Sequence, residues 1–62
     1  MNNKPFISVS IKTLNESECI EKTIDSIRQQ LRGYPHKIIV ADSLSTDNTQ
    51  QLAGDKGVMV VS

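Results

Sequence analysis

The sequence predicts an α/β fold in which the three strands of a parallel sheet alternate with two helices. Two observations lead to this prediction. Short runs rich in β-branched residues begin at Phe6, Lys37 and Val58, and the segments between them switch to the period of an amphipathic helix. Strands joined by such long crossovers pair in parallel, with right-handed connections. The expected element order is therefore β-α-β-α-β.

The first strand and the first helix have the clearest patterns. Residues 6–11, FISVSI, combine apolar β formers with intervening serines, which is typical of a strand. An apolar stripe at helical spacing then predicts a helix over residues 16–32, with Ile20, Ile24, Ile27 and Leu31 on one face. We expect Asn15 to cap this helix, with Glu18 completing a capping box, and Gly33 to end it in a left-handed conformation.

The second half of the chain repeats the strand-helix-strand order. Residues 37–42, KIIVAD, form a continuous apolar run, which is typical of a strand covered on both faces. The next helix is expected to begin after Ser45 or Thr46 as its N-cap and to stop at Gly57, before a third strand at residues 58–62. Ligands of such sheets bind beyond the carboxyl ends of the strands. The segments after the first two strands are therefore the candidate site.

Length and composition exclude several classes of protein. The chain has 62 residues, a formal net charge of zero and one cysteine, so we expect no internal disulfide and no nucleic-acid partner. Cys19 and His36 are too sparse for a zinc site. No apolar run approaches the roughly 20 residues of a membrane span, and we expect a cytoplasmic protein. So short a chain is expected to be one part of a larger domain, with no internal boundary in residues 1–62.

Classical phosphate-binding loops are absent from the sequence. Neither G-x-x-x-x-G-K-[ST] nor G-x-G-x-x-G occurs, and the nucleophile elbow G-x-S-x-G is missing as well. The candidate site is instead a set of side chains after the first two strands, namely Thr13, Asn15, Glu16, Asp42 and Ser43.

Asp42 is the most informative residue of this set. A carboxylate only accepts hydrogen bonds, so Asp42 suits an imide N–H or ribose hydroxyls and would repel a phosphate. Two interpretations stay open for Asp42, namely contact with a ligand and stabilisation of the turn that follows. The next polar residues, Ser45, Thr46 and Asp47, are explained by capping of the second helix.

Two segments together resemble one enzyme family. TLNE at residues 13–16 follows the first strand, and DSLSTDNT at residues 42–49 follows the second at the expected spacing. From Phe6 to Ser62, the chain is similar to the opening of a family 2 glycosyltransferase of the GT-A type. The resemblance implies a three-layer Rossmann-like parallel sheet, present here as its N-terminal β-α-β-α-β portion. It also implies transfer of a sugar from a nucleoside-diphosphate donor to a saccharide or lipid-linked acceptor.

The resemblance further implies which residues bind the nucleotide. These are Thr13, Leu14 and Glu16 in the first loop, and Asp42 and Ser43 at the end of the second strand, with Lys12 near the diphosphate. Family members often have a stacking tyrosine in place of Leu14 and a second aspartate in place of Ser43. Ser45 and Asp47 would fix the turn and the start of the second helix.

The same resemblance places the rest of the chemistry outside this chain. The ligands of a divalent metal, Mg²⁺ or Mn²⁺, and the catalytic base would follow Ser62, so no catalytic or metal-binding residue is expected here. The complete protein would be cytoplasmic, and the inner face of the membrane is a second expected location. The remainder of the domain, or another chain, would cover the open edge of the first strand. The alternative function is a non-catalytic Rossmann-like module that binds a nucleotide or a protein.

Overall fold

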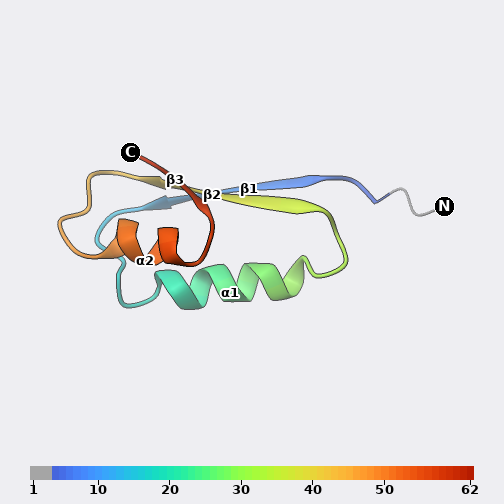
Figure 1. Cartoon of the computed structure of the whole chain (residues 1–62), viewed down its shortest axis with the longest axis horizontal. Coiled ribbons are helices and arrows are strands. Elements are labelled where there is room, and N and C mark those ends of the chain that lie inside the picture. Colours follow the sequence, from blue (N-terminus) through green and yellow to red (C-terminus); the bar gives the residue numbers. More distant parts are fainter. Residues whose placement is uncertain (1–3) are drawn as a thin grey trace.

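The computed structural model describes residues 4–62, which form a sheet of three strands and two helices (Figure 1). The elements are β1 (Ile7–Thr13), α1 (Ile20–Gln30), β2 (His36–Asp42), α2 (Thr49–Asp55) and β3 (Met59–Val61). All strand pairs are parallel and the strand order is β1-β2-β3. The predicted β-α-β-α-β order and its Rossmann-like parallel sheet are confirmed.

The register of the sheet determines where the loops lie. β1 pairs with β2 along its whole length, and the last pair places Thr13 opposite Asp42. Because the two strands end at the same level, the loops that follow them emerge side by side where the carboxyl ends of the strands lie, which we call the carboxyl edge of the sheet. β3 pairs only with the second half of β2, from Ile39 to Ala41.

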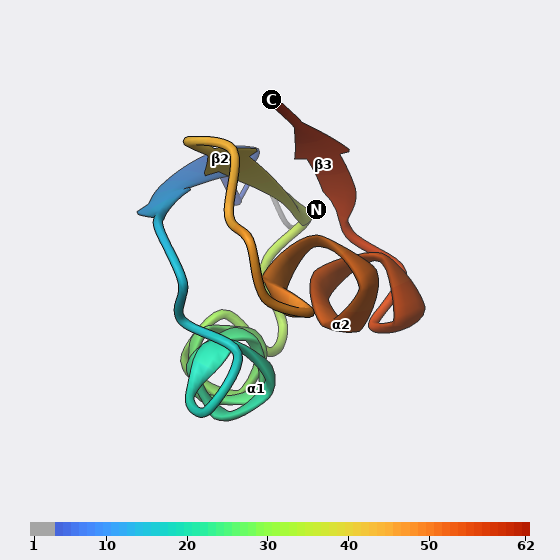
Figure 2. The same ribbon diagram turned by 90° about the vertical axis from the view of Figure 1, so that its left-hand side faces the viewer.

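Both helices lie on the same face of the sheet (Figure 2). This follows from the strand order, because two right-handed crossovers that progress in one direction place both helices on one side. The buried apolar side chains come from the helices and from the inward positions of β2, namely Ile20, Ile24, Ile38, Val40 and Ala53. These residues form the core between the sheet and the helices.

The opposite face of the sheet is apolar over β2 and β3. Ile39 and Ala41 are half-buried there, while Met59 and Val61 are 59% and 44% exposed. The apolar run of β2 predicted a strand covered on both faces. Within residues 4–62, however, the two helices cover only one of them.

The first helix is shorter than predicted. It begins at Ile20 rather than at residue 16, and Cys19 precedes it without a side-chain capping bond. The predicted capping box of Asn15 and Glu18 is wrong, since Asn15 adopts a left-handed conformation with φ of 52°. The helix ends at Gln30, two residues early, and Gly33 has the predicted left-handed conformation with φ of 91°.

The second helix also begins later than expected. Ser45 and Thr46 were expected to be its N-cap, but α2 begins at Thr49 and Asn48 precedes it without a side-chain capping bond. Gly57, with φ of 81°, follows the helix as predicted. Neither helix in the described part of the chain is long and apolar enough to cross a membrane.

Candidate functional site

The candidate site is the carboxyl edge of the sheet, where two loops meet. We call residues 14–19, between β1 and α1, the first loop, and residues 43–48, between β2 and α2, the second loop. The backbone N–H of Ser43 donates to the carbonyl oxygen of Thr13 at 2.9 Å, which extends the pairing of the strands into the loops. The two loops are therefore held side by side from their first residues.

Asp42 is the centre of the hydrogen-bond network between the loops. Its Oδ1 accepts hydrogen bonds from the hydroxyls of Thr13 at 2.6 Å and Ser45 at 2.5 Å. Its Oδ2 accepts from the backbone N–H of Ser45 and from Nε2 of Gln50, both at 2.7 Å. An ionised carboxylate has about four lone-pair sites, and this chain fills them all.

The environment of Asp42 keeps its carboxylate ionised. The hydrogen bonds from Ser45, Thr13 and Gln50 hold the pKa of Asp42 well below its usual range. The residue is only 3% exposed. Because no acceptor site is free, the geometry favours the turn-stabilising interpretation of Asp42 over direct contact with a ligand.

Thr49 and Asp47 make a second connection between the loops. The hydroxyl of Thr49, which is fully buried, accepts a hydrogen bond from the backbone N–H of Glu16 at 2.8 Å and donates to Asp47. Asp47 also accepts from the backbone N–H of Ser17 at 3.1 Å and of Thr49 at 2.9 Å. The hydrogen bond from the Thr49 side chain lowers the pKa of Asp47 to about 2.

Asn15 makes the third connection. Its backbone N–H donates to the hydroxyl of Ser45 at 2.8 Å, and its side-chain oxygen accepts from the backbone N–H of Thr46 at 2.8 Å. Asparagine tolerates the left-handed conformation that this arrangement requires. The N–H groups of Asn15 and Ser17 are thus satisfied by the second loop, and that of Glu16 by Thr49 at the start of α2, which explains why α1 starts late.

The predicted site residues separate into a buried and an exposed group. Thr13 and Asp42 are buried and in contact, and Glu16 is half-buried with its N–H bound to Thr49. The exposed residues are Lys12, Leu14 and Ser43, with Leu14 57% exposed. Because side chains alternate along a strand, Lys12 lies on the face of the sheet opposite to that of Thr13.

Three residues of the site were not found from the sequence. Thr49 and Gln50 are the first residues of α2, and their reach across to Glu16 and Asp42 depends on the angle at which the helix packs. Leu44 has a φ of 59° and is 74% exposed. A left-handed conformation costs a residue other than glycine about 1–2 kcal/mol, and a leucine gives no sequence signal for it.

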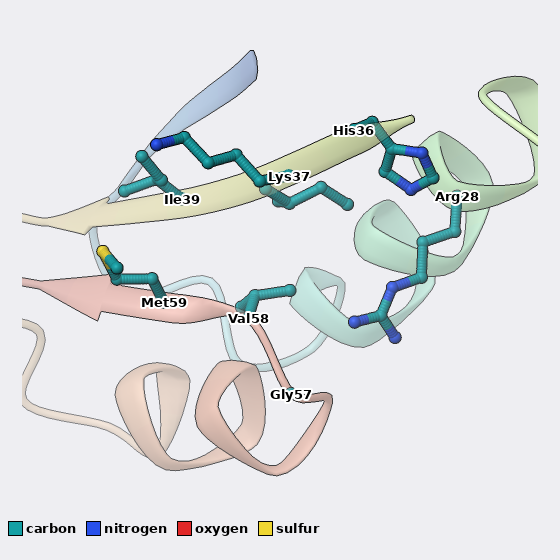
Figure 3. Close-up of a pocket in the computed structure, with 8 residues that line it drawn as sticks. Arg28, His36, Lys37, Ile39, Gly57, Val58 and Met59 are labelled. Carbon is teal, nitrogen blue, oxygen red and sulfur yellow. The ribbon is translucent and has the colours of Figure 1, made fainter. Parts of the chain in front are cut away.

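A hollow of about 250 Å³ lies at the other end of the sheet, beside the amino ends of β2 and β3 (Figure 3). Arg28 donates from Nη2 to the carbonyl of Lys56 at 2.5 Å. Lys37 runs along β2 towards Ile39, away from Arg28, so the two cations do not converge on one point (Figure 3). The lining residues are Arg28, His36, Lys37, Ile38, Ile39, Gly57, Val58 and Met59.

A metal site is not formed by this part of the protein. Among residues 4–62, no three His, Cys, Asp or Glu side chains lie together where they could hold a metal ion. The two aspartates that link the loops, Asp42 and Asp47, already accept hydrogen bonds on both carboxylate oxygens.

The lowered pKa of Asp47 predicts a dependence of stability on pH. The folded-state pKa of about 2 lies below the ordinary value of 3.8, so the ionised carboxylate stabilises the fold above pH 4. This contribution is lost as the pH falls from about 4 to about 2. We expect the difference in melting temperature between wild type and Asp47→Asn to shrink as the pH falls over this range. A difference that stays constant with pH would contradict this prediction.

Comparison with known proteins identifies similar sequences. The family model described as Glycosyl transferase family 2 matches residues 8–59. The chain is 46% identical over 56 residues to the glucosyl-3-phosphoglycerate synthases of Mycobacterium tuberculosis (strain CDC 1551 / Oshkosh) and Mycobacterium bovis. It is 39% identical over 56 residues to that of Mycolicibacterium smegmatis. Each match covers 90% of this chain but only 17–18% of the relative. No solved structure matches the chain significantly.

Proposed function

The chain belongs to glycosyl transferase family 2, and on this premise we propose that it is the nucleotide-binding part of an enzyme that transfers a sugar. The donor in this proposal is a nucleoside-diphosphate sugar. The observation that carries the proposal is the position of the two linked loops, which meet at the carboxyl edge of a parallel sheet. In α/β sheets this edge is where ligands bind.

We divide the site residues into two roles. Leu14 and Ser43 are exposed at the ends of adjacent strands, and we propose that they contact the nucleotide, with Lys12 nearer the diphosphate. Thr13, Glu16 and Asp42 are then positioning residues. The buried bond between Thr13 and Asp42 and the partly buried bond from Glu16 to Thr49 support this role, because they fix the loops before a ligand arrives. Such preorganisation removes the cost of ordering the loops on binding.

The names of the relatives suggest a donor sugar and an acceptor. A glucosyl-3-phosphoglycerate synthase joins a glucosyl group to 3-phosphoglycerate. The similarity to three such enzymes extends over 90% of this chain. We therefore propose a glucosyl donor and a 3-phosphoglycerate acceptor for the complete protein. A saccharide or a lipid-linked acceptor is the second choice, and it rests only on membership of the family.

The proposal includes a divalent metal, Mg²⁺ or Mn²⁺, held by residues outside this chain. Bound to the diphosphate, such an ion would neutralise the charge of the leaving group. The residues described here do not fit a metal site, because Asp42 and Asp47 have both oxygens occupied. No part of the reaction is therefore assigned to a metal bound by these 59 described residues, 4–62.

We also propose that residues outside this chain complete the domain. They would cover the apolar face of the sheet at Ile39, Ala41, Met59 and Val61 and pair with the free edge of β1. The exposed apolar side chains of that face support this, since large exposed apolar patches usually mark contact surfaces.

Calorimetry tests the proposed function. The sample is the longest natural polypeptide that carries these residues, called the full-length protein below. We expect it to bind at least one nucleoside diphosphate in the presence of Mg²⁺, and to release that diphosphate from the corresponding glucosyl donor when 3-phosphoglycerate is added. Failure to bind any of the uridine, guanosine, adenosine, cytidine and thymidine diphosphates would refute the proposal.

Leu14 offers a more specific test. An aromatic ring stacks on a base better than an aliphatic side chain, so Leu14→Tyr is expected to tighten nucleotide binding by up to ~1 kcal/mol. Calorimetry of the full-length protein measures the change. Lys22→Tyr, on the exposed side of α1, is the control and should leave the affinity unchanged. Equal or weaker binding by Leu14→Tyr would mean that Leu14 does not line the base site.

A further inference from the structure

Leu44 combines two unfavourable features, a left-handed backbone and an exposed apolar side chain. Its φ of 59° is a conformation that leucine rarely adopts, and its side chain is 74% exposed. A single exposed leucine is ordinary on a protein surface. A strained and exposed leucine is not, because glycine or asparagine would adopt the same backbone with less strain.

The hydrogen bonds around Leu44 keep it in this conformation. On one side, the backbone N–H of Ser43 donates to the carbonyl of Thr13 at 2.9 Å. On the other side, the backbone N–H and the hydroxyl of Ser45 donate to Asp42 at 2.7 and 2.5 Å. Leu44 is thus held at the tip of a fixed turn, at the carboxyl edge of the sheet.

Most polar groups at this edge are already bonded within the chain. The carboxylates of Asp42 and Asp47 each accept hydrogen bonds on both oxygens. The side-chain oxygen of Asn15 accepts from Thr46. Lys12 and Asn15 are exposed at this edge as well. The other exposed residues next to the two strand ends are Leu14, Ser43 and Leu44. Two of these three are leucines, and an uncharged, flat, apolar ligand surface suits them best.

We propose that Leu44 is a specificity-determining residue of the nucleotide site, with its side chain packed on the face of the base. The inference rests on the proposed function and adds to it a residue and a mode of recognition. Because a leucine offers no hydrogen bond, this contact selects a base by its shape and apolar surface. The phosphate groups of the nucleotide gain no affinity from this apolar contact.

Two substitutions separate a ligand contact from a structural role. Leu44→Gly removes the side chain and the backbone strain, whereas Leu44→Ala removes most of the side chain and keeps the strain. In the full-length protein, we expect Leu44→Gly to keep or raise the melting temperature while it weakens nucleoside-diphosphate binding about fivefold or more, because the apolar area that the leucine buries against the base is lost. Leu44→Ala should weaken binding to a similar degree with little change in melting temperature. A purely structural role would move stability and affinity in the same direction.

Inorganic pyrophosphate, which has no base, is the control ligand. Its affinity should be the same for wild type and both Leu44 variants. Wild-type affinity for nucleoside diphosphates in both variants would overturn the inference and leave the proposed function intact. A fall in melting temperature together with weaker binding of every ligand, pyrophosphate included, would also overturn it, because Leu44 would then pack within the complete domain. A wild-type protein that binds no nucleoside diphosphate would refute the proposed function, and the assignment of Leu44 would fall with it.

Discussion

Asp42→Ala is expected to lower the melting temperature of the full-length protein and to weaken nucleoside-diphosphate binding about tenfold or more. The substitution removes the acceptor of the hydrogen bonds from Thr13, Ser45 and Gln50. The buried hydroxyl of Thr13 would lose this partner, and Ser45, which also binds Asn15 of the first loop, would lose its anchor. Members of a connected network depend on one another, so the loss should exceed that of one isolated hydrogen bond.

Calorimetry and thermal unfolding of the same variant measure the two effects. Asp55→Ala is a suitable control, because Asp55 is exposed at the last residue of α2, away from the carboxyl edge. A normal melting temperature with weakened binding would instead mean that Asp42 contacts the ligand directly. Unchanged affinity for every nucleoside diphosphate would remove the two loops from the proposed site.

The second large effect concerns the 62-residue chain in isolation, which is expected not to form a stable monomer. Five apolar side chains are buried among residues 4–62, and a chain of this size needs more than such a core to offset the loss of chain entropy. Met59 and Val61 remain exposed on the uncovered face of the sheet. β1 and β3 are both edge strands, and unpaired edges favour association with other chains.

Urea unfolding followed by circular dichroism, with sedimentation at low concentration, tests this expectation. We expect a broad, non-cooperative change or self-association for the isolated chain, and a cooperative transition for the full-length protein. A cooperative transition from a monodisperse 62-residue monomer would show that this segment is a domain by itself. The proposal that other residues complete the sheet would then be wrong.

The sequence was sufficient to predict the order of elements and the direction of the strands. Ile20 and Ile24 repeat at helical spacing and are buried as a result, and Ile38 and Val40 alternate inward on β2 as strand residues should. These features depend on local periodicity and on the rule that long crossovers join parallel strands. They need no knowledge of contacts between distant residues.

The details of the site depended on contacts that periodicity does not report. Asn15 has the spacing of an N-cap, yet it bonds Ser45 and Thr46, about thirty positions later, and α1 starts after it. From the sequence, Asp42 looked available to a ligand. In the structure its acceptor sites are filled, in part by Gln50 of the next helix, and the sequence gives no sign of that contact. The resemblance to the family predicts a nucleotide site at the carboxyl edge of the sheet, whereas the division between exposed and buried residues came from the structure.

The most direct test of the central claim is to map nucleotide binding on backbone amide resonances of the full-length protein. A saturating nucleoside diphosphate with Mg²⁺ should shift the amides of Leu14, Ser43 and Leu44 at the carboxyl edge. The amides of Lys37 and Gly57, beside the hollow at the opposite end of the sheet, should stay unchanged. Shifts confined to Lys37, Gly57 and their neighbours, or no shift in either group, would contradict the assignment of the nucleotide to the two linked loops.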